Sequence, residues 1–107
     1  MPKFLVQKAA AVRIRNIFSY TLENWGDKQA QVYIEGLFQT FNDIANKNTV
    51  WRPIPAEFEV IGFYAIYKKH YIYWKELQSG QIGIVTVLHE RMHQLARFKE
   101  DKDESFT

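Results

Sequence analysis

Two spacings of apolar residues divide the chain, one helical and one typical of strands. In the first half, apolar side chains recur every three or four residues, as on one face of a helix. One stripe comprises Ile14, Ile17, Phe18, Leu22 and Trp25, and a second comprises Ala30, Ile34, Leu37, Phe38, Phe41 and Ala45. Gly26 and Asp27 lie between the stripes and are residue types that end one helix and cap the next. The pattern therefore predicts two helices joined tightly as an antiparallel hairpin.

Segments with strand character lie on both sides of this hairpin. Residues 4–7 predict a short first strand, and Pro53 and Pro55 predict an irregular connection after the second helix. Aromatic and β-branched residues then fill 58–67, 71–77 and 81–88, with polar turns between them. In the last segment alternation places Ile82, Ile84, Thr86 and Leu88 on one face and Gly83, Val85, Val87 and His89 on the other. Apolar residues on both faces predict a central strand.

These elements predict an α+β fold. Its order is an N-terminal strand, an antiparallel helical hairpin, a three- to four-stranded antiparallel sheet and a short C-terminal helix over residues 90–99, with the hairpin on one face of the sheet. A length of 107 residues predicts a single domain over residues 1–107. Glu100, Asp101, Asp103 and Glu104 make the end acidic, and we expect residues 98–107 to form a mobile charged tail.

Composition narrows the classes of function. A hydrophobic fraction of 47% excludes a disordered chain, and a net charge of only +2 means that any basic surface must be local. The absence of cysteine excludes disulfides and thiolate zinc sites and fits a reducing compartment. No segment approaches the roughly 20 apolar residues that cross a bilayer. We therefore expect a cytoplasmic protein that does not engage a membrane.

Residues 87–93, VLHERMH, contain the His-Glu-x-x-His pattern of zinc peptidases. Such a site needs both histidines one turn apart on one helix, and usually a third protein ligand. Here His89 ends a predicted strand instead, and the only histidine besides His89 and His93 is His70. The pattern therefore predicts no metal and no cofactor, and a zinc peptidase is disfavoured. His89, Arg91 and His93 remain candidates for an acid, cation and base set.

Several short sequence motifs resemble those of the RelE/ParE superfamily of type II toxins, and most closely those of its ParE-like branch. These motifs are Trp25-Gly26 followed by Gln29, Ala30 and Tyr33 in the hairpin, Gly62-Phe63 in the sheet, and Gln81, Ile82, Ile84, Val85, Val87, Leu88, His89 and Met92 around the last strand. The resemblance extends over roughly residues 4–94 and includes the order of the elements.

The resemblance implies a toxin that binds DNA gyrase so that cleaved DNA persists, and that a cognate antitoxin neutralises. It implies no catalytic site, and no direct DNA binding without the antitoxin. The alternative is the RelE branch, whose members cut messenger RNA on the ribosome with cations and acid/base groups. In that case His89, Arg91 and His93 would be catalytic. Tyr64 occupies the position at which the family's Gly-Tyr-Arg motif has Arg. A nontoxic family member that only binds the antitoxin is therefore a third alternative.

Candidate binding residues follow from charge and aromatic content. They are Tyr64, Lys68, Lys69, His70, Tyr73 and Arg91. The basic run 68–70 is also what a solvated turn would contain. The aromatic set Tyr64, Tyr67, Tyr71, Tyr73 and Trp74 could stack on bases, but packing across adjacent strands is the favoured interpretation.

Overall fold

The structure, a computed structural model, describes residues 3–102. Along the chain it forms β1 (Phe4–Val6), α1 (Lys8–Trp25), α2 (Asp27–Ala45), β2 (Arg52–Pro53), the 3-10 helix η1 (Ala56–Phe58), β3 (Phe63–Tyr67), β4 (His70–Glu76), β5 (Ile82–His89) and α3 (Gln94–Asp101). The described strands form one sheet in the order β1-β5-β4-β3-β2, with β1 parallel to β5 and the other pairs antiparallel. The predicted α+β class and order of elements are confirmed. The sheet has five strands because short β1 and β2 extend its two edges.

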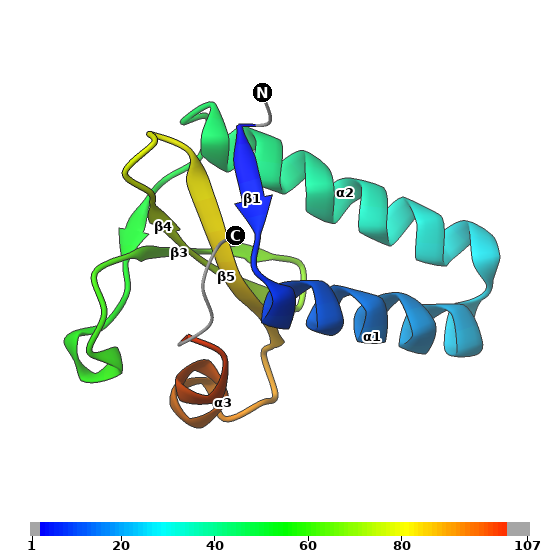
Figure 1. Cartoon of the computed structure of the whole chain (residues 1–107). Coiled ribbons are helices and arrows are strands. Elements are labelled where there is room, and N and C mark those ends of the chain that lie inside the picture. Colours follow the sequence, from blue (N-terminus) through cyan, green and yellow to red (C-terminus); the bar gives the residue numbers. More distant parts are fainter. Residues whose placement is uncertain (1–2, 103–107) are drawn as a thin grey trace.

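The two long helices meet at Gly26. Its φ of 91° lies in the region that side chains rarely adopt, and its N–H ends α1 by donating to the Leu22 carbonyl. Its own carbonyl accepts from the Ala30 N–H, so the same residue also begins α2. Asp27, predicted as the cap, is instead the first residue of α2, where a negative charge is favourable. The resulting hairpin extends well beyond the sheet at its closed end (Figure 1).

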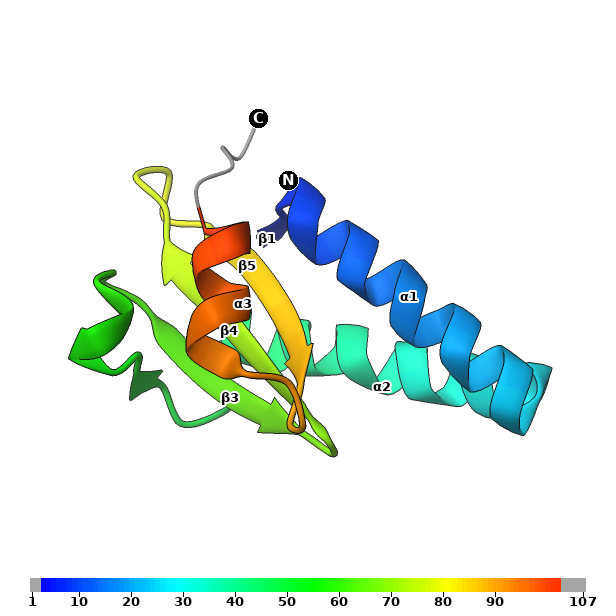
Figure 2. The ribbon, with the colours of Figure 1, turned by 90° about the horizontal axis from the view of Figure 1, so that it is seen from below.

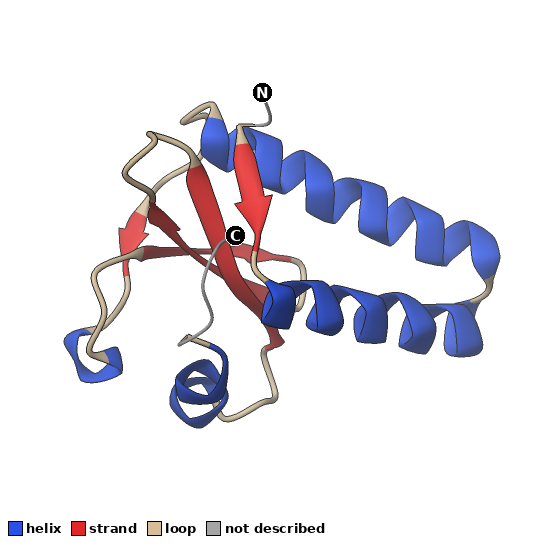
Figure 3. Ribbon diagram, in the orientation of Figure 1, coloured by secondary structure: helices blue, strands red, loops and turns tan. Residues whose placement is uncertain are grey.

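The sheet is covered on both faces. The hairpin packs on one face, and α3 packs on the opposite face (Figures 2 and 3). The hairpin-side core includes Ile14, Leu37, Phe41, Ile72, Trp74, Ile84 and Val87, and the α3-side core includes Ile54, Phe58, Tyr73, Val85, Leu88 and Phe98. Every residue from Ile82 to Leu88 is buried, which confirms the predicted central strand.

A β-bulge in β5 changes which residues share a face. Val85 has no residue opposite it in β4, because the partners of Ile84 and Thr86 are consecutive residues. One extra residue reverses the alternation beyond it. Thr86 and Leu88 therefore face α3 together with Val85, whereas Val87 faces the hairpin with Ile84. Strict alternation had grouped Ile84 with Thr86 and Leu88, so that part of the prediction was wrong.

The C-terminal helix starts later than predicted, at Gln94 rather than near residue 90, and ends at Asp101. Phe98 is 1% exposed and packs against Phe58 and Tyr73 with ring centroids 5.2 and 5.1 Å away. The expected mobile tail therefore does not begin at residue 98, and residues 103–107 lie outside the described residues. No helix within residues 3–102 is long and apolar enough to cross a membrane.

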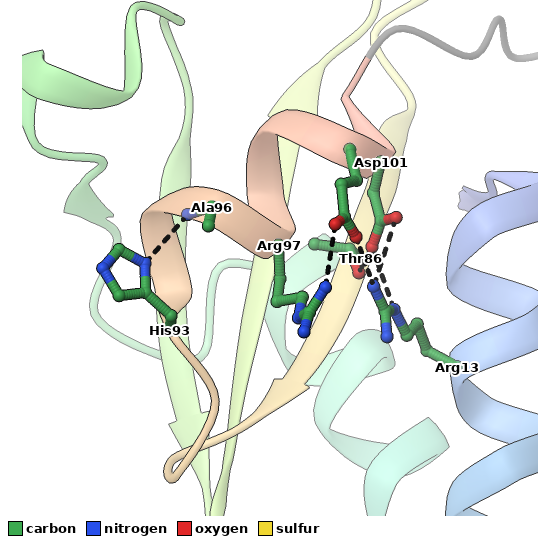
Figure 4. A network of polar contacts seen from close by, with 7 residues as sticks. Arg13, Thr86, His93, Ala96, Arg97 and Asp101 are labelled. Carbon is green, nitrogen blue, oxygen red and sulfur yellow. Dashed lines mark hydrogen bonds and ion pairs between the residues drawn. The ribbon is translucent and has the colours of Figure 1, made fainter.

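Asp101 fastens α3 to the rest of the molecule (Figure 4). Its carboxylate accepts from Arg13 Nε of α1 at 3.0 Å and from Thr86 Oγ1 of β5 at 2.8 Å. Its backbone carbonyl accepts from the buried Gln7 side chain. A buried carboxylate is tolerated only when its acceptor capacity is filled in this way. The residue predicted to belong to a solvated tail is therefore the polar junction of three elements.

We predict that Asp101→Ala lowers the free energy of unfolding by about 2–3 kcal/mol, because Arg13 and Thr86 lose their shared partner in a buried position. Urea denaturation at pH 7 measures the change. The neighbouring substitution Glu100→Ala is the matched control: it removes two ion pairs whose Glu100 side chain is 53% exposed, so the expected loss is within about 0.5 kcal/mol. Equal losses in the two variants would contradict a buried junction at Asp101.

Gly62 lies where β3 begins, and a Cβ there would lie 2.7 Å from the Trp74 backbone carbonyl oxygen. We predict that Gly62→Ala destabilises the protein by about 1–3 kcal/mol, because the strand backbone must shift to relieve the contact. Thermal unfolding provides the measurement. Ile61→Ala is the control, since Ile61 is 95% exposed and its loss should leave the melting temperature nearly unchanged.

Candidate functional site

An open groove of about 690 Å³ runs between the hairpin and the adjoining ends of β4 and β5. Its walls include Arg13, Ile17, Tyr20, Trp25, Tyr33, Lys68, Lys69, His70, Val87, His89, Arg91 and Met92. A second hollow of about 400 Å³ at the hairpin tip adds Lys28 and Val32 and shares Trp25, Gln29, Tyr33 and Lys68 with the first. The shared residues make the two hollows one elongated depression, which we call the hairpin groove.

The fold brings the β3–β4 turn next to the end of β5. His70 is the cross-strand partner of His89, with ring centroids 5.1 Å apart, and the Glu90 N–H donates to the Lys69 carbonyl at 2.8 Å. The predicted candidates Lys68, Lys69, His70, His89 and Arg91 therefore all line the hairpin groove. They come from two segments about twenty residues apart in sequence.

Tyr33 of α2 holds His70 in the floor of the groove. Its hydroxyl oxygen lies 2.6 Å from Nδ1 of His70, and the two groups share a hydrogen bond. Burial, with a smaller contribution from His89, lowers the pKa of His70 to about 4, and burial raises the pKa of Tyr33. At neutral pH both groups are uncharged, so the hydrogen bond joins a neutral hydroxyl to a neutral imidazole.

A second tyrosine fixes Tyr33 from the other side. The Tyr67 hydroxyl donates to the Tyr33 backbone carbonyl at 2.9 Å, and Lys68 Nζ lies 5.9 and 5.8 Å from the Tyr33 and Tyr67 ring centroids. Gly36 allows this arrangement, because a Cβ there would lie 2.1 Å from the Tyr67 hydroxyl oxygen. The sequence singled out Tyr33 only as part of the hairpin motif and gave no sign of its contact with His70.

Three predicted site residues lie outside the groove. Tyr64 and Tyr73 belong to the opposite, α3-covered face of the sheet. Tyr73 is 2% exposed and donates its hydroxyl to Gln94 Oε1 at 2.9 Å, and burial raises the pKa of Tyr73. His93 caps α3, where its Nδ1 accepts the Ala96 N–H at 3.2 Å (Figure 4). The set His89, Arg91 and His93 is therefore divided, with only its first two members in the groove.

The His-Glu-x-x-His pattern does not form the geometry of a zinc peptidase. His89 is the last residue of β5, and its Nδ1 accepts the Arg91 N–H at 3.0 Å, whereas His93 is the cap that precedes α3. The two rings are not one turn apart on a helix, which is what such a site requires. Within residues 3–102 no three His, Cys, Asp or Glu side chains are grouped as metal ligands would be.

The groove combines positive charge with apolar surface. Among the residues described, its lining contains no Asp or Glu. Arg13 is paired with Asp101, but Lys28, Lys68, Lys69 and Arg91 make no ion pair within residues 3–102. Tyr20 and Trp25 are each 65% exposed on α1 beside these cations. Such a surface suits an elongated anionic partner with apolar groups.

The sequence matches a known protein family, and the fold resembles that of a solved structure. The model of a family described as "ParE toxin of type II toxin-antitoxin system, parDE" matches residues 5–94. A solved structure described as "Chromosomal ParDE TA system from P. aeruginosa" has a similar chain, with a TM-score of 0.65 over 83% of this chain and 96% of that one. At 12% sequence identity that likeness concerns the fold alone. No curated protein sequence gives a significant match.

The lowered pKa of His70 predicts a loss of stability in acid. Between the ordinary histidine pKa of 6.5 and about 4, the unfolded chain binds a proton at residue 70 and the native protein does not. The free energy of unfolding should therefore fall as the pH drops through this window, by up to roughly 3 kcal/mol. His70→Asn keeps a hydrogen-bonding partner for the Tyr33 hydroxyl and should flatten the dependence of the free energy of unfolding on pH, measured by urea denaturation from pH 7 to 4. His93→Asn, which removes an exposed histidine, should leave the profile unchanged; an equally flat profile in that control would refute the assignment.

Proposed function

The chain belongs to the ParE family of toxins of type II toxin–antitoxin systems, and on that premise we propose that it poisons DNA gyrase by binding to it. The family match over residues 5–94 is the observation that carries the proposal, since it includes the hairpin, the whole of β5 and the β3–β4 turn. The resemblance inferred from the sequence is thereby confirmed at the level of the family. As a toxin of the parDE kind it has a cognate antitoxin as partner. Gyrase would place its site of action in the cytoplasm.

The hairpin groove supports a binding mechanism. Tyr20, Trp25 and Val32 are 57–65% exposed on a hairpin that extends beyond the sheet (Figure 1), so a large partner can reach them. Aromatic residues and arginine are the side chains that most often dominate protein interfaces. Arg91 and the two lysines of the β3–β4 turn complete such a surface along one side of the groove.

The RelE-like ribonuclease is the second candidate, favoured by the meeting of His70, His89 and Arg91 in one cationic groove. Cleavage of RNA needs a group that accepts the 2′-hydroxyl proton and a cation near the phosphate. Arg91 could serve as that cation. His70, however, already engages Nδ1 in its hydrogen bond with the Tyr33 hydroxyl, His89 Nδ1 accepts the Arg91 N–H, and His93 does not line the groove. The ribonuclease therefore remains the alternative.

Assays with purified toxin distinguish these functions. We predict that increasing toxin abolishes supercoiling by gyrase and accumulates cleaved plasmid DNA, while messenger RNA on translating ribosomes stays intact. The groove variant Trp25→Ser/Arg91→Gln should need at least about tenfold more toxin for the same effect, because it removes an aromatic and a charged contact. The variant Val50→Ser/Arg52→Gln makes equivalent changes at exposed positions outside the groove and should act like the unchanged protein.

Each other outcome identifies a competing function. Cleavage of ribosome-bound messenger RNA with gyrase unaffected would replace the proposal by the ribonuclease. No effect in either assay, together with normal growth when the toxin is expressed without its antitoxin, would indicate a nontoxic family member.

A further inference from the structure

The positive charge of the hairpin groove is concentrated along one path. Lys68 and Lys69 in the β3–β4 turn, Arg91 after β5 and Lys28 in α2 come from three parts of the chain, and all four line the same depression. None of them is ion-paired within the described residues 3–102, and none of the lining residues there is acidic. Asp27 and Glu90, which directly precede Lys28 and Arg91 in the sequence, are exposed but do not line the groove. Four cations without an ion-pair partner among the described residues, on a protein of net charge +2, form a local cationic surface that can bind an anionic ligand.

Aromatic side chains accompany these cations. Tyr20 and Trp25 of α1 line the groove and are each 65% exposed, so a ring face of each is open to a ligand. They are five residues apart on one helix, hence about 7.5 Å apart along its axis and roughly 140° apart around it. Stacked bases in a duplex are separated by only ~3.4 Å. Bases that stack on both rings must therefore be splayed, which is possible for an unpaired strand and not for a duplex.

From this geometry we infer that the hairpin groove binds single-stranded DNA, with phosphates on Lys28, Lys68, Lys69 and Arg91 and bases on Tyr20 and Trp25. A cationic groove bordered by aromatic side chains is the general design of proteins that bind unpaired strands without sequence preference. This departs from the expectation of no direct DNA binding, because the sequence does not reveal that the four cations share one groove.

The choice of DNA rather than RNA rests on the proposed function, since gyrase exposes the toxin to DNA. Binding of nucleic acid by the groove rests only on its charge and aromatic rings. An acidic protein segment is the competing occupant; it would also use the cations and could pack on Tyr20 and Trp25, but it would place no base against a ring. The distinction can be measured, because stacking places a base against Trp25 and quenches its fluorescence.

The test uses full-length toxin and a fluorescein-labelled dT12 oligonucleotide at 50 mM salt, with binding followed by anisotropy. We expect binding whose affinity falls with salt with a log–log slope of about −3, the value for four phosphate contacts on a single strand. Duplex DNA of equal length should bind at least about fivefold more weakly, and rU12 should bind no more tightly than dT12. Trp25→Ala should weaken dT12 binding about tenfold, as expected for loss of one stacked base.

A charge-matched pair of variants separates the groove from bulk charge. The groove variant is Lys68→Asn/Lys69→Gln/Arg91→Gln, with Asn at residue 68 because its φ of 52° lies in the left-handed region that Asn tolerates. The control is Lys8→Gln/Arg52→Gln/Lys99→Gln, three exposed cations outside the groove. The groove variant should lose at least about tenfold in affinity and most of the salt slope. The control should stay within about twofold, and both should melt near the unchanged protein.

Absence of dT12 binding, equal weakening in the two charge variants, or an unchanged affinity in Trp25→Ala would overturn the inference. Preferential binding of rU12 would overturn the choice of DNA. An acidic peptide that binds more tightly than dT12, depends on the same cations and displaces dT12 would identify the occupant as protein. Because dT12 binding is measured without gyrase, toxin that binds DNA but leaves supercoiling intact would refute the proposed function alone.

Discussion

The burial of β5 on both faces is the constraint on which the rest of the structure depends. Residues 82–88 have no exposed face, so the strand must have a neighbour on each edge and a layer on each side. β1 and β4 provide the edges, the helical hairpin covers one side, and α3 covers the other. β5 ends at His89, and the hairpin groove opens there, between the hairpin and the adjoining ends of β4 and β5.

The two covering layers differ in what they do. α3 is held by Phe98 in the core and by the carboxylate of Asp101, which joins it to α1 and β5 (Figure 4). That face is therefore closed and contributes stability. The hairpin is longer than the sheet that it covers, so its closed end lacks a partner and exposes Tyr20, Trp25 and Val32. Stability and binding are thus assigned to opposite faces of one strand.

The sequence predicts those features that depend on neighbouring residues. Helix periodicity and Gly26 suffice for the hairpin, and an apolar run without polar positions suffices for the central strand. The bulge at Val85 was not predictable, because it depends on the register that β4 adopts against β5. This is why the faces of Thr86 and Val87 were assigned wrongly.

Long-range polar contacts were equally inaccessible. Asp101 looked like part of a solvated acidic run, yet its partner Arg13 is 88 residues away. Tyr33 contacts His70, which is 37 residues away in sequence, and neither residue type by itself predicts the contact. Lys68, Lys69, His70, His89 and Arg91 were recognised as candidates by residue type, but only the cross-strand pairing of His70 with His89 puts them in one groove.

Action on gyrase through the hairpin groove is the function that we propose for this ParE-family chain. The most direct measurement is recovery of gyrase covalently attached to DNA from cells in which the toxin is expressed without its antitoxin. Such complexes should accumulate with the unchanged toxin and fall to background with Trp25→Ser/Arg91→Gln at equal protein level. Growth arrest without covalent gyrase–DNA complexes would contradict this function.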